Sequence, residues 1–297
     1  MGDTEMELMV QDFIKYLANR QVAKNTLVSY ERDVNQLLAY TAKLGKKLAD
    51  LKSEDIQAYV AFLQTEGKST ATISRAVASI KTFYRYLYKN KLIEENYAEC
   101  VVSPKVEKKD LSILSVKEIE TLLEQPSTTD LKGLRDKAML ETLYATGMRV
   151  TELISLKVAD VNLNYGYIKI KKKNKERSIP IGNVAVRYLK EYIDEVRPLL
   201  IKTDEEEYLF INANGKEMTR QGFWKILKQY KEQANIDKEL TPHTIRHSFA
   251  VHMLQNGAEV KSVQALLGHT DVASTMMYTH ILDLNLKDEY LNTHPRG

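Results

Sequence analysis

Histidine, arginine and tyrosine side chains gather in one part of this 297-residue chain, between residues 241 and 280. Five of the six histidines lie there, together with Arg246 and Tyr278. An arginine offers a rigid fork of donors that matches two phosphate oxygens, and histidines can donate or exchange protons. A tyrosine hydroxyl is a competent nucleophile where positive charge stabilises its oxyanion. Together these residue types are suited to phosphoryl transfer to a tyrosine.

Local signals predict that helical segments separated by tight turns carry these side chains. Thr241 and Pro242 are typical of a helix start, because a hydroxyl can cap free amides and proline suits the first helical position. His243 and Arg246 then lie one turn apart on the same face. Gly257 indicates where this first helix stops.

A second helix is expected over residues 260–267, ending at Gly268 and leaving His269 on the turn. A short third segment begins near Ser274 and carries Tyr278. Taken singly, each residue is better explained as structural, since the chain has 17 tyrosines. Their spacing and the rest of the chain must therefore decide.

Three motifs occur here in a defined order: His-x-x-Arg at His243 and Arg246, Leu-Gly-His ending at His269, and Ser-Thr-x-x-Tyr-Thr-His from Ser274 through Tyr278. They resemble the motifs of the tyrosine recombinase family, and more narrowly of its Xer branch of bacterial site-specific recombinases. The spacing of nine from His269 to Tyr278 also fits that family.

Length and composition indicate a soluble, two-domain protein, with 43% hydrophobic residues and no apolar run that could span a bilayer. The single cysteine, Cys100, excludes an internal disulfide and suits a reducing compartment, so we expect a cytoplasmic protein. The 43 basic residues nearly balance the 40 acidic ones. Any DNA-binding face must therefore come from local clusters of charge.

Residues 5–90 show the apolar spacing of four amphipathic helices. Asn25 is a candidate cap for the second, Ser53 opens the third, and Gly67 closes it. The fourth is expected to begin at about Thr70. The pattern, including Asn25-Thr-Leu-x-x-Tyr, resembles the family's SAM-like core-binding domain, which clamps one side of the DNA.

We assign residues 1–95 to this domain, 96–111 to a linker and 112–297 to an α-rich catalytic domain with a C-terminal subunit-docking segment. Ser115 and Glu118 predict a capping box at the start of the second domain. The expected fold is thus mainly α with a small β-sheet.

Gly147 permits a sharp turn, after which Arg149 lies beside the free amides of a helix start, a favourable anion pocket. A structural salt bridge to Glu152 or Asp160 is the alternative. Ala-Thr-Gly-x-Arg-x-x-Glu-Leu resembles the family's first catalytic arginine motif. The resemblance implies that Arg149 and Arg246 grip the two non-bridging oxygens of the scissile phosphate.

Residues 167–181 alternate apolar and basic side chains around a turn, which predicts a β-hairpin. A solubilised sheet edge is the simpler explanation of its charge. In the family this hairpin carries a lysine that protonates the leaving 5′ oxygen, usually within Gly-Lys-Gly. Here both glycines are lysines; counting back from Asn174-Lys-Glu-Arg selects Lys172, with Lys171 and Lys173 as alternatives.

Further helices are expected over residues 184–196 and 219–234, with a short strand over 208–212. Most basic side chains are explained by an ordinary solvated surface. A phosphate could still be held at the helix start near Lys68, by amides, hydroxyls and the lysine together. The side chains we expect to contact DNA are Lys68, Thr70, Lys171, Lys173, Lys175 and Arg220.

The resemblance implies that Tyr278 attacks a DNA phosphate, forms a 3′-phosphotyrosine and releases a 5′-hydroxyl. His243 would serve in proton transfer and His269 would hydrogen-bond the phosphate. Because a phosphodiester is exchanged for a phosphotyrosine of similar energy, no metal, ATP or other cofactor is expected. By resemblance, a homo- or hetero-tetramer would act on two double-stranded DNA sites, in chromosome dimer resolution at a dif-like site.

Three alternatives remain open. The first is a mobile-element integrase of the same family, and the second is a non-catalytic DNA-binding protein on the same scaffold. The third is a metal-dependent hydrolase, because His243 and His247 have a metal-compatible spacing, although Thr244 stands where a zincin would have Glu. A type IB topoisomerase is disfavoured by the Xer-like ends of the chain.

Overall fold

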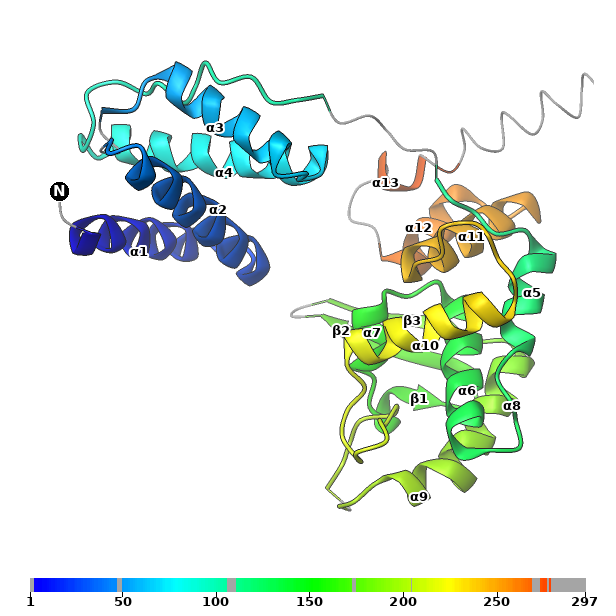
Figure 1. The fold of residues 1–297 in the computed structure, drawn as a ribbon. Coiled ribbons are helices and arrows are strands. Elements are labelled where there is room, and N and C mark those ends of the chain that lie inside the picture. Colours follow the sequence, from blue (N-terminus) through cyan, green and yellow to red (C-terminus); the bar gives the residue numbers. More distant parts are fainter. Residues whose placement is uncertain are drawn as a thin grey trace, which may run out of the picture. The chain divides into compact units, whose positions relative to one another are not determined.

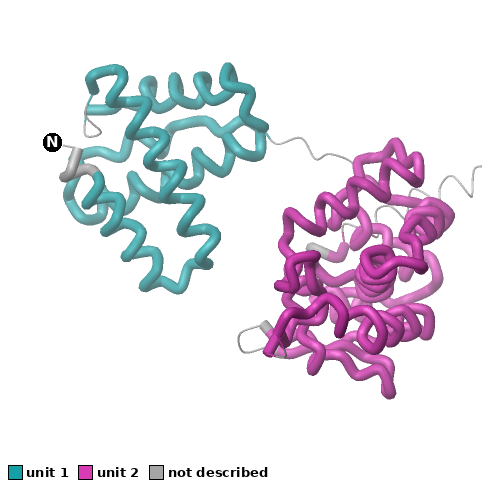
Figure 2. Tube along the Cα trace, turned by 60° about the horizontal axis from the view of Figure 1, so that its bottom comes forward, with its two compact units in different colours: residues 1–109 teal, residues 110–297 magenta. Residues whose placement is uncertain are grey.

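The computed structural model describes residues 3–46, 50–105, 111–172, 175–203, 205–268, 273–276 and 278 (Figure 1). They belong to two compact units, residues 1–109 and 110–297, each enclosing a hydrophobic core (Figure 2). The prediction of a mainly helical fold with a small sheet is confirmed. Among the described residues, no helix is both long and apolar enough to cross a membrane.

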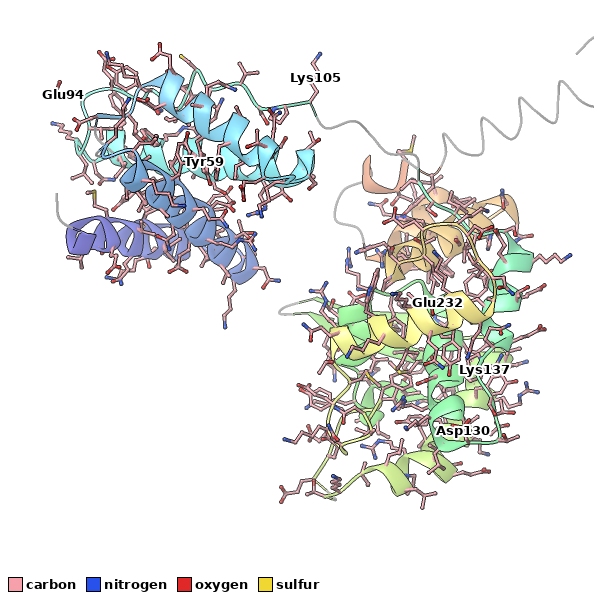
Figure 3. The ribbon with its side chains drawn as sticks, viewed as in Figure 1. Tyr59, Glu94, Lys105, Asp130, Lys137 and Glu232 are labelled. Atoms are coloured by element: carbon pink, nitrogen blue, oxygen red, sulfur yellow. The ribbon has the colours of Figure 1, made fainter. Side chains whose placement is uncertain are left out.

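The described part of the first unit forms four helices, as predicted: α1 (Asp3–Asn19), α2 (Lys24–Lys43), α3 (Ser53–Thr65) and α4 (Thr70–Lys89). Each helix contributes a fully buried side chain to one core, and these are Phe13, Leu37, Ile56 and Phe83. Tyr59, also on α3, lies within the same core (Figure 3). Beyond α4, Ala98 and Val101 are buried in it too. Apolar spacing along the sequence therefore specifies this unit.

The prediction that Asn25 caps α2 is wrong. The helix begins at Lys24, because the Ala23 carbonyl already accepts the amides of Thr26 and Leu27 at 2.8 and 3.1 Å. Ala23 has extended backbone angles and no side chain that could cap. Asn25 therefore lies inside the first helical turn.

The second unit is built around α6, which packs against α5, α7, α8 and α11. Its described elements are α5 (Val116–Glu124), α6 (Leu131–Thr146), α7 (Val150–Ile154), η2 (Val158–Asp160), β1 (Val161–Asn162), β2 (Tyr167–Lys172), β3 (Lys175–Pro180), α8 (Asn183–Glu191), η3 (Tyr192–Val196), α9 (Arg197–Leu200), α10 (Arg220–Gln233), α11 (Pro242–Gln255), α12 (Val260–Leu267) and α13 (Ala273–Met276). Charged side chains of α6 are buried as pairs, Arg135 with Asp136 and Lys137 with Glu141. The central position of α6 fixes where its C-terminal end lies.

Strands β2 and β3 form the predicted hairpin, with Ile168 opposite Ile179, and β1 adds a short antiparallel strand beside β2. The predicted capping box at the start of α5 is confirmed. The Ser115 hydroxyl accepts the Glu118 amide at 3.2 Å, and the Ser115 amide donates to the Glu118 carboxylate at 2.7 Å. Both features come from short sequence patterns.

The short strand predicted over residues 208–212 is wrong. Within the described residues, Tyr208 and Ile211 form only isolated bridges. At Ile211, side chains take both backbone groups that a continuous strand would pair. Ile211 donates its amide to the Tyr192 hydroxyl at 3.1 Å, and its carbonyl accepts from Arg135 at 3.1 Å.

Candidate active site

The turn that follows α6 sets the position of Arg149. Gly147 has φ of +57°, in the left-handed region, and its amide donates to the Leu143 carbonyl at 2.9 Å. The chain then reverses, and Arg149 becomes the N-cap of α7, its amide donating to the Glu152 carboxylate at 2.8 Å. A Cβ at position 147 would lie 2.3 Å from a ring carbon of Phe249. Both the backbone angle and the close approach require glycine here.

We expect Gly147→Ala to lower the free energy of unfolding by about 2–4 kcal/mol, from left-handed strain and overpacking against Phe249. Gly257→Ala is a matched control in the same unit, because Gly257 also has positive φ but meets no atom within 4 Å. The control should cost about 1 kcal/mol. Urea denaturation of both variants measures the difference. Equal losses would show that Phe249 moves aside freely.

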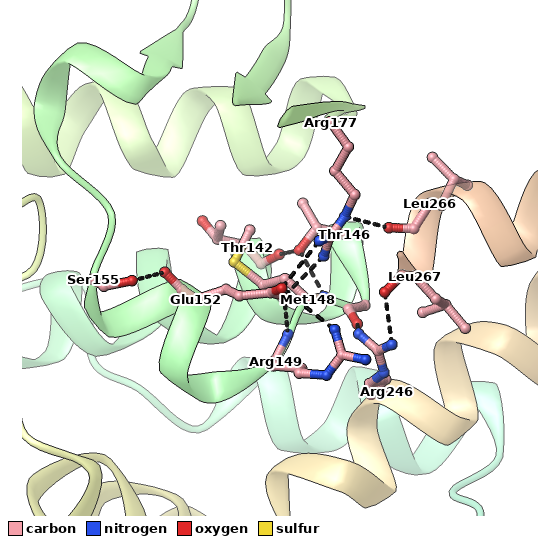
Figure 4. A network of polar contacts seen from close by, with 11 residues as sticks. Thr142, Thr146, Met148, Arg149, Glu152, Ser155, Arg177, Arg246, Leu266 and Leu267 are labelled. Atoms are coloured by element: carbon pink, nitrogen blue, oxygen red, sulfur yellow. Dashed lines mark hydrogen bonds and ion pairs between the residues drawn. The ribbon is translucent and has the colours of Figure 1, made fainter. Parts of the chain in front are cut away.

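Arg246 connects this turn to the C-terminal end of α12. It lies on α11, whose start is capped by Thr241 accepting the Thr244 amide at 3.1 Å, as predicted. The Arg246 side chain is only 3% exposed, and it donates to the Gly147 carbonyl at 2.7 Å and to the Leu267 carbonyl at 2.8 Å (Figure 4). Burial, together with the charge of Arg149, lowers the pKa of Arg246 to about 10, so it stays cationic at neutral pH.

A charged network of Glu152 and Arg177 supports Arg149 (Figure 4). Arg177, on β3, donates to both oxygens of the Glu152 carboxylate at 3.0 and 2.8 Å, and to the Leu266 carbonyl at 3.1 Å. Arg149 contacts the same carboxylate at 3.4 Å, so the expected alternative of a salt bridge to Glu152 is present as well. Burial alone would raise the pKa of Glu152, but the bonds from Arg177 and the Arg149 amide outweigh it and leave that pKa lowered.

We expect Arg177→Gln to lower the free energy of unfolding by about 2 kcal/mol, because the Glu152 side chain is largely buried and would lose a bidentate partner. The hairpin that carries Lys172 would also lose its link to the end of α12. A double-mutant cycle with Glu152→Gln, followed by urea denaturation, tests the pairing. The double variant should lose less stability than the two single losses added. Simple additivity would contradict a specific pair.

Tyr278 lies against α11 in a small core of its own with Phe249 and Leu267. Its side chain is 1% exposed, and its hydroxyl lies 2.9 Å from Nδ1 of His247. Burial raises the pKa of Tyr278, whereas the charges of Arg246 and Arg149 lower it. Both arginines therefore act electrostatically on the phenol.

His243 and His247 occupy successive turns of α11, with ring centroids 6.2 Å apart. Partial burial and the charges of Arg246, Arg149 and Arg220 lower the pKa of His243. Burial, His243 and Arg246 lower the pKa of His247 to about 4, so His247 is neutral at pH 7. The sequence suggested His247 only as a metal ligand. Its spacing of four from His243, which puts both histidines on one face of α11, was the available signal that it faces this site.

The structure thus brings together Arg149, His243, Arg246 and Tyr278. Lys172 ends β2, with its backbone opposite that of Lys175. The predictions for His269, Lys173 and the side chains of Lys172 and Lys175 lie outside the described residues. Among the residues that are described, no three histidine, cysteine or acidic side chains gather in a group that could hold a metal.

The proposed DNA contacts fall on both units. Arg220 begins α10 and lines, with Trp224 and His243, a cavity of about 700 Å³ next to the site. Lys171 is exposed and lies 3.3 Å from Asp160. In the first unit, exposed Lys68 and Thr70 flank Ser69, whose hydroxyl caps α4 by accepting the Thr72 amide. The side chains available to hold a phosphate at this helix start are therefore Lys68, Ser69, Thr70 and Thr72.

Comparison with known proteins identifies the family. Residues 112–284 match the phage integrase family, and residues 10–91 match the phage integrase N-terminal SAM-like domain. Proteins named tyrosine recombinase XerD are 42% identical over 298 residues in Listeria monocytogenes and 44% identical over 297 residues in Oceanobacillus iheyensis; each match covers 98% of this chain and all of the relative.

Solved structures agree with this assignment. The XerH site-specific recombinase bound to palindromic difH substrate has a TM-score of 0.75 at 22% identity, covering 95% of this chain and 94% of that one. XerA recombinase is 28% identical, with a TM-score of 0.55, over 98% of this chain and 99% of its own. The chain belongs to the phage integrase family of tyrosine recombinases, and it is a site-specific recombinase that breaks and rejoins DNA.

Proposed function

We propose that this chain is an Xer-type recombinase that resolves chromosome dimers at a dif-like site, using Tyr278 as its nucleophile. The observation that carries this proposal is the convergence of Arg149, His243, Arg246 and Tyr278 on the ends of α6 and α12. Its full-length relatives named XerD support the Xer role over that of a mobile-element integrase. The transposon integrase among similar structures is only 20–22% identical.

The two arginines hold the scissile phosphate. Arg246 is immobilised by two backbone carbonyls, and Arg149 is fixed by its capping position and by Glu152. Donors that are already in place stabilise negative charge as it builds on the phosphate oxygens, without reorganisation during the reaction. His269 adds a hydrogen bond to the same phosphate.

Proton transfers complete the reaction. The Tyr278 oxygen attacks phosphorus, the bond to the 5′ oxygen breaks, and a 3′-phosphotyrosine remains on the protein. Lys172, or its neighbour Lys171 or Lys173, gives a proton to the leaving 5′ oxygen, with His243 assisting. The phosphodiester energy is kept in the phosphotyrosine, so the 5′-hydroxyl of a partner strand can reverse the step without ATP or metal.

The two units divide the work of binding. Residues 1–95 form the clamp, contacting backbone phosphates through Lys68 and Thr70, and residues 112–297 form the catalytic domain. The linker predicted over 96–111 joins them, but its first part packs on the clamp through Ala98 and Val101. On the catalytic side the DNA contacts are Lys171, Lys173, Lys175 and Arg220. A homo- or hetero-tetramer in the cytoplasm assembles two double-stranded sites, with the C-terminal segment docking on a neighbouring subunit.

The test is a nicked duplex that contains a dif-like site, placed so that the 5′-hydroxyl fragment diffuses away after cleavage. With chelator present, wild-type protein should give a covalent protein–DNA band on a denaturing gel. Digestion and mass spectrometry should then find the nucleotide on the peptide that contains Tyr278. DNA binding without an adduct, with and without a partner recombinase, would favour the non-catalytic alternative. An adduct lost on chelation would favour the metal-dependent one.

A further inference from the structure

His247 has no part in the mechanism described above, yet it lies within hydrogen-bond distance of the proposed nucleophile. Its Nδ1 lies 2.9 Å from the Tyr278 hydroxyl, and the two rings are 5.6 Å apart. It follows Arg246 directly on α11 and lies one turn beyond His243. A residue in this place meets the phenol before any DNA is bound.

The direction of this hydrogen bond decides what His247 can do. Partial burial and the charge of Arg246 disfavour the imidazolium, so the ring is neutral, with one protonated and one free nitrogen. With the proton on Nε2, Nδ1 presents its lone pair to the phenol and accepts its hydrogen. With the proton on Nδ1, the ring would instead donate to the phenol oxygen and occupy the lone pair that attacks phosphorus. The first tautomer therefore leaves a lone pair of the Tyr278 oxygen available to attack phosphorus.

We infer, on the basis of the proposed function, that His247 holds the Tyr278 hydroxyl and takes up its proton through Nδ1 as the tyrosine oxygen attacks the phosphate. The O–H bond of Tyr278 breaks as its O–P bond forms, the 5′ oxygen leaves with a proton from the hairpin lysine, and His247 becomes an imidazolium. In the rejoining step the same imidazolium returns the proton to the departing tyrosine oxygen.

DNA binding strengthens this role. The phosphodiester brings a negative charge next to Arg246, which opposes the positive charges that keep His247 neutral. The bound phosphate thereby raises the proton affinity of His247 at the stage when the phenol must lose its proton. The free protein keeps the tyrosine protonated and enclosed.

A purely structural role for His247 has a counterpart on the same helix. His252 is buried, and its Nδ1 lies 2.9 Å from the Tyr144 hydroxyl. The pair His252 and Tyr144 repeats the contact geometry of His247 and Tyr278 away from the arginines. His252→Asn is therefore the matched control for His247→Asn, since each variant replaces a histidine that contacts a tyrosine hydroxyl by a side chain that cannot take up a proton.

The first measurement uses the nicked duplex in two forms, one ordinary and one with sulfur in place of the bridging 5′ oxygen. A thiolate leaves without needing a proton, because its pKa is far below that of an alcohol. His247→Asn should slow adduct formation about 100-fold on both substrates. Lys172→Ala should form the adduct slowly on the oxygen substrate and at close to the wild-type rate on the sulfur substrate. His252→Asn should match wild type on both.

The second measurement removes the tyrosine from the reaction. In a Tyr278→Phe background, a strand that ends in a 3′-nitrophenyl phosphate is joined to a 5′-hydroxyl, and nitrophenolate leaves without a proton. Here His247→Asn should have no effect, since its target is absent. If His247→Asn slowed this joining reaction about 100-fold as well, His247 would only support the site. The inference would also be overturned if His247→Asn formed the adduct at the wild-type rate on both nicked substrates. Absence of an adduct from wild type itself would instead count against the proposed function.

Discussion

Tyr278→Phe will bind its DNA site as tightly as wild type and form no detectable covalent adduct, a loss on the order of 10⁴-fold or more. The substitution removes one oxygen, and that oxygen is the proposed nucleophile. Binding should be unaffected because the tyrosine is 1% exposed and the phenyl ring keeps its contacts with Phe249 and Leu267. Losing the contact with His247 should cost about 1 kcal/mol of stability.

Adduct formation on the nicked duplex and DNA affinity by gel shift measure the two halves of this prediction. Tyr144→Phe is the control, because it removes a tyrosine hydroxyl that also contacts a histidine on α11. It should lose comparable stability and retain cleavage. An adduct that persists in Tyr278→Phe would mean that another residue attacks the phosphate, and peptide mapping of that adduct would identify it.

The helix boundaries of the catalytic unit could be predicted because they depend on local chemistry. Thr241 caps α11, and glycines with positive φ follow the ends of α6, α11 and α12 at Gly147, Gly257 and Gly268. Each signal needs only a few neighbouring residues. The prediction for Asn25 was wrong because it also used only local chemistry. Asn25 is a good capping residue, but it lies two positions beyond the true N-cap, Ala23.

The hydrogen bonds and ion pairs that hold the site residues in place could not be predicted, because they join residues far apart in the chain. Arg177 and Glu152 are separated by 25 positions, and Arg246 reaches a carbonyl 99 positions away at Gly147. No spacing rule relates such residues before the fold brings them together. The prediction of a strand at 208–212 failed on similar grounds, since side chains from α6 and η3 bond both backbone groups of Ile211.

Resemblance supplied the candidate set, and geometry adds how its described members are held. The motifs placed Arg149, Arg246 and Tyr278 in one site, but they gave no reason for Glu152 beyond a structural bridge. In the structure Glu152 caps α7, pairs with Arg177 and contacts Arg149. One carboxylate therefore links Arg149, a proposed catalytic residue, to the hairpin that carries Lys172.

Arg246→Lys is expected to slow adduct formation about 10³-fold or more at saturating protein, with little change in DNA affinity. The guanidinium bonds two backbone carbonyls with separate nitrogens, at Gly147 and Leu267, and these bonds fix its position in the proposed phosphate site. A lysine ammonium has no planar fork, so it cannot bridge both carbonyls and still offer paired donors to two phosphate oxygens. The change removes charge stabilisation that matters most in the transition state.

Single-turnover kinetics separate this effect from binding, and urea denaturation reports the stability lost when a buried carbonyl is left unpaired, about 1–3 kcal/mol. Arg220→Lys is the contrasting variant, since Arg220 is exposed at the start of α10 and is proposed to contact DNA. It should weaken binding modestly, in a salt-dependent way, and leave the saturated rate near that of wild type. If Arg246→Lys instead lost affinity while its saturated rate stayed normal, Arg246 would be a DNA-binding residue, and the charge developing on the phosphate would have to be stabilised from elsewhere in the site.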